Sequence, residues 1–119
     1  MPQTSDPSDL IPLTPRGFHI LVSIADEPRN GYEIMTAVEE NSSGAVRVSP
    51  GTLYEALHRM NGQGLIEEVS KGLGSRTDGR RQRFYQLTAF GRRVLEQETA
   101  RLANDLRLAR GSGFAGEVL

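Results

Sequence analysis

Apolar residues recur along the chain at two different periods. Helical spacing appears in four stretches, and two short runs rich in β-branched and aromatic residues lie between the third and fourth of them. The first helix is predicted to begin after Thr14-Pro15, where a capping hydroxyl precedes a proline at the first helical position. It ends before Pro28, and its apolar positions are Phe18, Leu21, Val22 and Ala25.

Two further helices are predicted in the first half of the chain. The second runs from Asn30-Gly31 to about Glu40, where a stretch of Asn, Ser and Gly ends it. The third begins at Ser49-Pro50 and ends at Asn61-Gly62. Its apolar face carries Leu53, Ala56, Leu57 and Met60. Residues 46–48, between the two helices, are predicted to be a brief strand or a linker.

A β-hairpin and a long last helix are predicted in the second half. The strands are Leu65–Val69 and Arg83–Leu87, joined by a long loop rich in glycine and basic residues. Thr88 then caps a helix with a heptad-like seam formed by Leu95, Thr99, Leu102, Leu106 and Ala109. A seam of about two heptads is too short for a stable isolated coiled coil, so the domain itself or a second chain is expected to cover it.

The order helix, helix, helix, hairpin, helix predicts the fold class. It is mainly α with a small β-hairpin, as in a winged helix-turn-helix followed by a C-terminal helix. Residues 1–12, rich in proline, serine and aspartate, are predicted to be a disordered N-terminal arm. Residues 13–87 form the winged helix-turn-helix, residues 88–110 the last helix, and residues 111–119 a flexible tail.

Composition narrows the class of protein. A chain of 119 residues suits one small domain, and the absence of cysteine excludes disulfides and thiolate metal sites. The two histidines lie on different predicted helices and no nucleophile stands beside a base, so neither enzyme activity nor a metal or cofactor is expected. No run is apolar enough to span a membrane and no export pattern begins the chain, so a cytoplasmic location is expected.

Charge is distributed unevenly along the chain. Residues 1–46 carry 2 basic and 7 acidic side chains, whereas residues 47–93 carry 9 basic and 4 acidic ones. Residues 71–93, which include the hairpin loop, hold seven basic side chains against Asp78 alone. A basic hairpin of this kind favours a polyanionic partner, although charge by itself also fits a solvated loop.

The outward face of the third helix carries the chemistry that such a partner requires. Its residues are Gly51, Thr52, Glu55, His58 and Arg59. Hydroxyl, imidazole and guanidinium groups reach base edges and phosphates from a helix in the major groove. Small residues at the helix start let backbone N–H groups approach a phosphate, and Ser49 serves as a cap, a phosphate contact or both. Glu55 is placed to pair with Arg59 one turn later.

Four segments of the sequence resemble the PadR family of bacterial transcriptional regulators. They are NGYEI (30–34), SPGTLYEALHRM (49–60), GLIEE (64–68) and GRRQRFYQLTAFGRRVL (79–95). The resemblance extends over roughly residues 13–110. It implies a dimeric winged-helix protein that binds palindromic promoter DNA, usually as a repressor, and releases it when an effector binds. It also implies the short form of the family, in which residues 88–110 are a dimerisation helix.

The resemblance also implies roles for individual residues. The predicted DNA-binding residues combine those that the resemblance implies with the outward and basic side chains described above. They are Tyr32, Ser49, Thr52, Tyr54, His58, Arg59, Lys71, Arg76, Arg80, Arg81 and Arg83. The predicted dimer contacts are Phe18, Leu95, Leu102 and Leu106. Tyr54 fits a structural role equally well, and Phe18 also fits core packing.

Three partners are therefore expected: double-stranded promoter DNA, a second copy of the chain and an unidentified small-molecule effector. No membrane partner is expected. The alternative is a winged-helix module that binds other proteins and no DNA. The basic hairpin argues against this alternative, because an excess of positive charge favours a polyanion.

Overall fold

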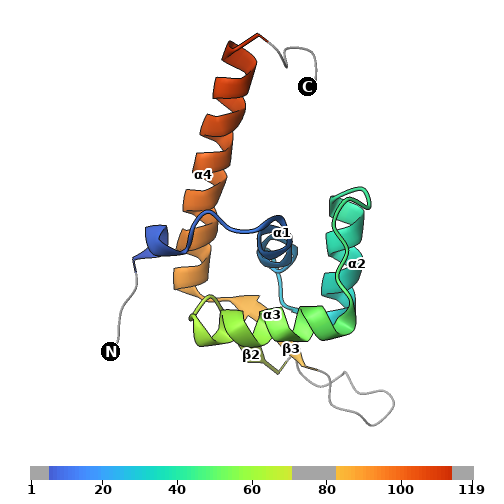
Figure 1. Ribbon diagram of the computed structural model, residues 1–119. Coiled ribbons are helices and arrows are strands. Elements are labelled where there is room, and N and C mark those ends of the chain that lie inside the picture. Colours follow the sequence, from blue (N-terminus) through green and yellow to red (C-terminus); the bar gives the residue numbers. More distant parts are fainter. Residues whose placement is uncertain (1–5, 71–82, 114–119) are drawn as a thin grey trace.

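The computed structural model describes residues 6–70 and 83–113. In chain order the elements are the 3-10 helix η1 (Pro7–Leu10), α1 (Pro15–Ser23), β1 (Arg29–Asn30), α2 (Gly31–Asn41), α3 (Pro50–Gly62), β2 (Ile66–Val69), β3 (Phe84–Leu87) and α4 (Ala89–Gly111). Helices α1, α2 and α3 gather near the small sheet, and α4 extends away from them (Figure 1). The predicted fold class, mainly α with a small β-hairpin, is confirmed.

The helices begin at the caps that the sequence indicates. The Oγ1 of Thr14 accepts the backbone N–H of Gly17 at 2.9 Å, at the start of α1. At the start of α2, the Asn30 side chain accepts the Glu33 N–H at 2.8 Å and the Glu33 side chain accepts the Asn30 N–H at 3.0 Å. These bonds satisfy N-terminal amides that have no acceptor within the helix.

The sheet is antiparallel and has the strand order β1-β3-β2. Strands β2 and β3 pair with Ile66 opposite Leu87, which confirms the predicted hairpin strands. Strand β1 lies on the other edge of β3, with Arg29 opposite Tyr85. The sequence does not predict β1, because a two-residue strand is too short to show alternation. Residues 46–48 form no strand, so they are the linker of the two alternatives.

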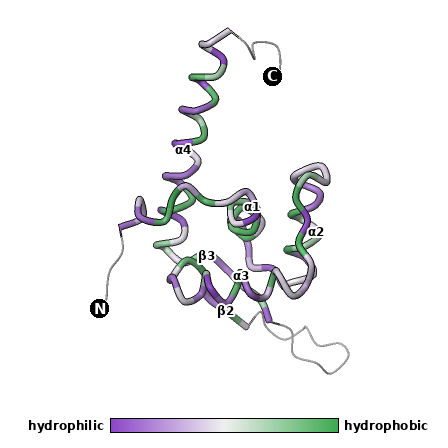
Figure 2. Tube along the Cα trace, viewed as in Figure 1, coloured by the Kyte–Doolittle hydropathy of each residue, from purple (hydrophilic) through white to green (hydrophobic). Residues whose placement is uncertain are grey.

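One hydrophobic core joins the helices to the sheet. Its fully buried side chains include Ile20, Ile34, Leu53, Leu65 and Val94. Figure 2 shows hydrophobic residues gathered in α1 and α2, whereas polar and apolar residues alternate along the distal half of α4. Burial in the core therefore accounts for the first turns of α4 and not for the rest of that helix.

The first turn of α4 lies tightly against the segment that follows α3. A Cβ atom at Gly91 would overlap the carbonyl oxygen of Leu65, so only glycine allows this approach. The Thr88 N–H donates to the Leu65 carbonyl at 3.1 Å, and the Thr88 hydroxyl donates to the Gly64 carbonyl at 2.6 Å. These contacts fix the direction in which α4 leaves the winged helix.

The prediction of a disordered arm is wrong for residues 6–12. Residues 7–10 form η1, and Leu10 and Ile11 pack against the hydrophobic core. Figure 1 shows η1 beside α4, with the segment that follows it running to α1. Residues 1–5, and the part of the predicted tail from residue 114 onward, lie outside the described residues.

A buried carboxylate on α4 anchors this N-terminal segment. Glu98 is 1% exposed, and its Oε2 accepts the Leu13 N–H at 2.9 Å. Arg101 donates to both Glu98 oxygens at 2.7 and 2.9 Å, and to Asp105 at 3.0 Å. The hydrogen bonds from Arg101 and the Leu13 N–H outweigh burial and lower the pKa of Glu98. The sequence does not predict this hydrogen bond, because Leu13 and Glu98 lie 85 residues apart.

Candidate nucleic-acid interface

Helix α3 separates its apolar and polar residues onto two faces, as predicted. The four apolar residues of the predicted inner face are all buried. On the other face, Gly51, His58 and Arg59 are exposed and Thr52 is partly exposed. The side chains available to a partner are therefore the small, hydroxyl, imidazole and guanidinium groups that contact DNA from a helix.

The start of α3 offers backbone donors at an open surface. The Ser49 Oγ accepts the Thr52 N–H at 3.3 Å and donates to the Thr52 hydroxyl at 3.1 Å, so Ser49 is the helix cap. Gly51 has open space around its Cα, with no atom within 4 Å of a Cβ added there. A phosphate can therefore approach the N–H groups and the positive end of the helix dipole without steric hindrance.

Two tyrosines project beside this helix start. Tyr32, in the first turn of α2, is 73% exposed, and Tyr54, in α3, is 45% exposed. The Tyr54 hydroxyl lies directly against Gly31, where any Cβ would overlap it. Tyr54 therefore contributes to the α2–α3 crossing while part of its ring stays accessible. Tyr32 has no comparable packing role, and so large an exposed aromatic side chain is available to a partner.

The base of the wing, formed by β2 and β3, adjoins the same surface. Burial, with a smaller contribution from the Glu68 charge, raises the pKa of Tyr85, and nearby Tyr54 contributes in the same direction. Arg83 acts against this shift by a hydrogen bond to Tyr85, and its Nε lies 3.6 Å from Glu68. Helix α3 itself packs against β2, so α3 lies next to the base of the wing.

Arg83 is the one predicted wing residue that the structure describes. Both Arg83 and Glu68 are well exposed, so their ion pair is weak and leaves Arg83 able to turn to another anion. Lys71, Arg76, Arg80 and Arg81 lie outside the described residues.

The predicted dimer contacts occupy two different environments. Leu95 is only 9% exposed and belongs to the core of its own chain. Phe18 is half-buried against that core, with its ring edge-on to His19 at a centroid distance of 5.6 Å. Leu102 and Leu106 are exposed, as is Leu108, which the heptad pattern does not include. Among the predicted contacts, Leu102 and Leu106 are thus the ones that residues 6–70 and 83–113 leave exposed.

The described residues offer little chemistry of other kinds. They contain no cluster of three or more histidine, cysteine, aspartate or glutamate side chains that could hold a metal ion. Over the same residues, no helix has the length and hydropathy needed to cross a membrane.

Three helices, an antiparallel hairpin and an exposed polar face on the third helix together define a winged helix-turn-helix protein. Residues 20–97 match the family model described as the transcriptional regulator PadR-like family. The chain belongs to this family of transcriptional regulators.

The chain is also similar in sequence to individual proteins, one of which is described as a transcriptional regulator. A transcriptional regulator of Mycobacterium tuberculosis is 38% identical over 80 residues, which cover 67% of this chain and 68% of that protein. An uncharacterized 37.1 kDa protein in a Streptomyces fradiae transposon is 38% identical over 85 residues. The match covers 71% of this chain but only 22% of that protein's length.

Solved structures share the fold. A PadR-like transcriptional regulator from Bacillus cereus has a TM-score of 0.68 and 26% identity, covering 82% of this chain and 90% of that one. Bacillus subtilis PadR in complex with operator DNA has a TM-score of 0.57 and 20% identity, covering 68% of this chain and 44% of that one.

Proposed function

We propose that the chain is an effector-responsive repressor that binds palindromic promoter DNA as a homodimer in the cytoplasm. The observation that carries this proposal is the exposed polar face of α3, which adjoins the base of a basic hairpin. The family membership and the DNA complex of Bacillus subtilis PadR support it. In this arrangement α3 enters the major groove and the wing follows the phosphate backbone.

Individual contacts follow from exposure and position. Thr52 and His58 face bases from α3, and the open backbone at Gly51 faces a phosphate beside Ser49. Tyr32 donates its hydroxyl to a neighbouring phosphate from the start of α2. The predicted wing residues Lys71, Arg76, Arg80, Arg81 and Arg83 supply charge along the backbone.

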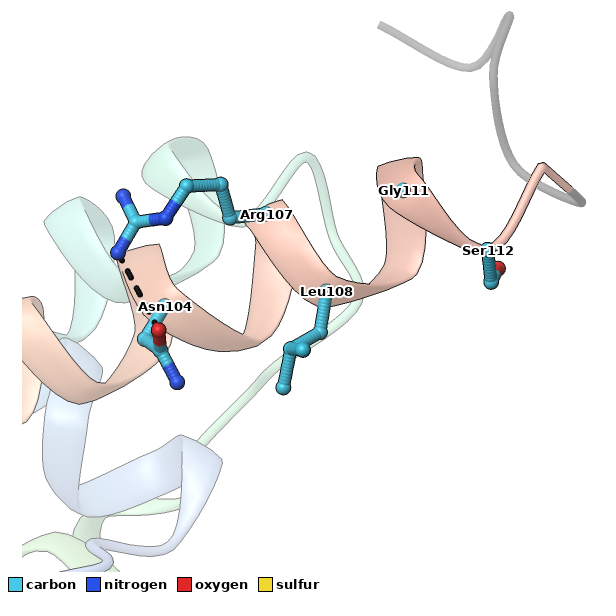
Figure 3. Close-up of a pocket in the computed structure, with 5 residues that line it drawn as sticks. All are labelled: Asn104, Arg107, Leu108, Gly111 and Ser112. Carbon is cyan, nitrogen blue, oxygen red and sulfur yellow. Dashed lines mark hydrogen bonds between the residues drawn. The ribbon is translucent and has the colours of Figure 1, made fainter.

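The distal half of α4 supplies the dimer contact in this proposal. Leu102 is 37% and Leu106 42% exposed, so their apolar surface remains for a second chain to cover. Figure 3 shows the end of this helix, where Arg107 donates to Asn104 at 3.2 Å and Leu108 projects from the surface. In a dimer the two α3 helices enter successive major grooves, about 10 base pairs apart.

The test is binding of purified protein to DNA from upstream of its own coding sequence, with a scrambled duplex as control. If each subunit neutralises about four phosphates, affinity falls by about four orders of magnitude between 50 and 200 mM salt. Thr52→Ala weakens binding to the operator more than to the scrambled duplex, whereas Arg80→Ala with Arg81→Ala weakens both alike. A monomer that leaves both duplexes unbound contradicts the proposal.

A further inference from the structure

Glu55 lies in the middle of the outward face of α3, and its side chain is exposed. At about 100° per residue, Thr52 and His58 lie about 60° to either side of it. The buried Leu53 and Leu57 lie about 160° away, on the opposite side of the helix. Figure 1 shows α3 along one edge of the molecule, with α1 on its inner side. Glu55 therefore points away from the core, with the other outward residues of α3 around it.

The Glu55 carboxylate is unpaired within residues 6–70 and 83–113. Over these residues it forms neither a hydrogen bond nor an ion pair, so the pair with Arg59 that the helical spacing predicts is not formed. Other exposed glutamates are paired, as Glu39 is with Arg47 at 3.5 Å. Glu55 is thus available to a group outside the described part of the chain.

A carboxylate on a helix face that enters DNA carries a cost. When α3 lies in the major groove, the phosphates of both strands are close enough to repel the negative charge of Glu55. A base that donates a hydrogen bond to the carboxylate offsets this repulsion, whereas a base without a suitable donor leaves it in place. Glu55 therefore favours some base sequences and rejects others.

The major-groove edges of the four bases select cytosine as the partner. A carboxylate offers only acceptors, so it requires a donor in the groove. Guanine presents N7 and O6, and thymine presents O4, all of which are acceptors that repel it. Adenine presents its N6 amino group beside the N7 acceptor, whereas cytosine presents the N4 amino group as its only polar group there. Cytosine is the base whose edge matches a carboxylate.

We propose that Glu55 accepts a hydrogen bond from the N4 amino group of one cytosine in each half of the operator, and so determines the base preferred at that position. This inference rests on the proposed function, because it takes α3 to lie in the major groove. Thr52 and His58 are each about 4.5 Å from Glu55 along the helix axis. Base pairs are about 3.4 Å apart, so these two residues then lie over neighbouring base pairs.

The first test is selection of duplexes from a randomised pool by the purified protein. Wild type recovers cytosine at one position of each half-site, whereas Glu55→Ala recovers any base there and keeps the other positions. Glu55→Gln recovers adenine at that position, because a glutamine amide binds the N6 and N7 atoms of adenine. Glu96→Ala removes the same charge from an exposed position of α4 and selects the wild-type sequence. Identical sequences selected by wild type and Glu55→Ala overturn the inference.

Fluorescence anisotropy on single duplexes then isolates the contact. Replacing the selected cytosine by thymine weakens wild-type binding about tenfold and weakens the binding of Glu55→Ala much less. On the scrambled duplex, Glu55→Ala binds more tightly than wild type, because it lacks a charge that the phosphates repel. Equal losses by the two proteins on the thymine duplex overturn the inference.

The outcomes distinguish this inference from the function on which it rests. If wild type prefers the operator and Glu55→Ala keeps every base preference, Glu55 is not a base contact and the proposed function stands. If Glu55→Ala, shown by circular dichroism to be folded, weakens binding to the operator and the scrambled duplex alike, Glu55 does not read a base. If wild type binds no duplex, the proposed function and this inference both fail.

Discussion

Glu98 and Leu13 join the N-terminal segment to α4 through one hydrogen bond of 2.9 Å, across 85 residues of sequence. The carboxylate is buried, and Arg101 neutralises it through two further hydrogen bonds. The Glu98 side chain thereby satisfies the Leu13 N–H and holds the N-terminal segment against α4.

Glu98→Ala is expected to destabilise the protein by about 2–3 kcal/mol. It leaves the Leu13 N–H without an acceptor and removes the charge that Arg101 faces. Urea denaturation followed by circular dichroism measures the change. Glu96→Ala, at an exposed position of the same helix, serves as the control and stays within about 0.5 kcal/mol of wild type. Equal stability of the two variants would show that the Glu98 contacts contribute nothing.

The Glu98 carboxylate also makes stability depend on pH. Arg101, followed by the Leu13 N–H, lowers the pKa of Glu98 below its ordinary value of 4.5. The stabilisation is therefore complete above pH 4.5 and is lost as the pH falls through the lower, folded-state pKa. The unfolding free energy of the wild type, measured from about pH 6 to pH 3, should fall more steeply than that of Glu98→Gln. Parallel curves would contradict this assignment.

Gly91→Ala should weaken the junction between α4 and the winged helix. The added methyl group overlaps the Leu65 carbonyl, which is backbone and cannot rotate away, so a loss of about 3 kcal/mol is expected. Gly62→Ala, at the end of α3 with open space around it, is the matched control. That variant should be neutral or slightly stabilising, since alanine restricts the unfolded chain. Thermal unfolding of both variants measures the difference.

Gly51→Ala separates stability from DNA binding. Its methyl group meets nothing within 4 Å, so the folded protein keeps or slightly gains stability. The same methyl group stands where the proposed phosphate approaches the start of α3, and DNA affinity should fall by about tenfold. Fluorescence anisotropy with the operator duplex measures this loss. Unchanged affinity would place the phosphate away from this helix start.

The leucines of α4 should respond to substitution in two distinct ways. Leu102→Glu with Leu106→Glu alters only exposed apolar surface, so each chain stays folded while the dimer dissociates. Leu95→Ala instead opens a cavity in the core and costs about 3 kcal/mol of stability. Sedimentation velocity reports the first effect and urea denaturation the second. A double variant that sediments like the wild type would exclude this face as the dimer contact.

Local signals were sufficient to predict most of the fold. Caps such as Thr14 and Ser49 act on amides only three residues away, and apolar spacing determines which face of α3 is buried. The outward residues Thr52 and His58 follow from the same geometry.

Features that depend on distant partners were not predicted. The ordered N-terminal segment depends on Glu98, and β1 forms because β3 offers it an edge. A heptad pattern cannot distinguish Leu95, which the core covers, from Leu102, which it does not.

Helix α4 is one uninterrupted helix of 23 residues, and the close contact between Gly91 and Leu65 fixes the position of its first turn. The direction in which each of its side chains points is therefore fixed relative to the winged helix. A single residue inserted after Arg101 would rotate Leu102 and Leu106 by about 100° about the helix axis and would keep the spacing of the Glu98–Arg101 contacts. In the proposed dimer, the two winged helices would then face different sides of the duplex. If the proposed dimer forms through Leu102 and Leu106, the number of residues in α4 sets the relative orientation of its two α3 helices.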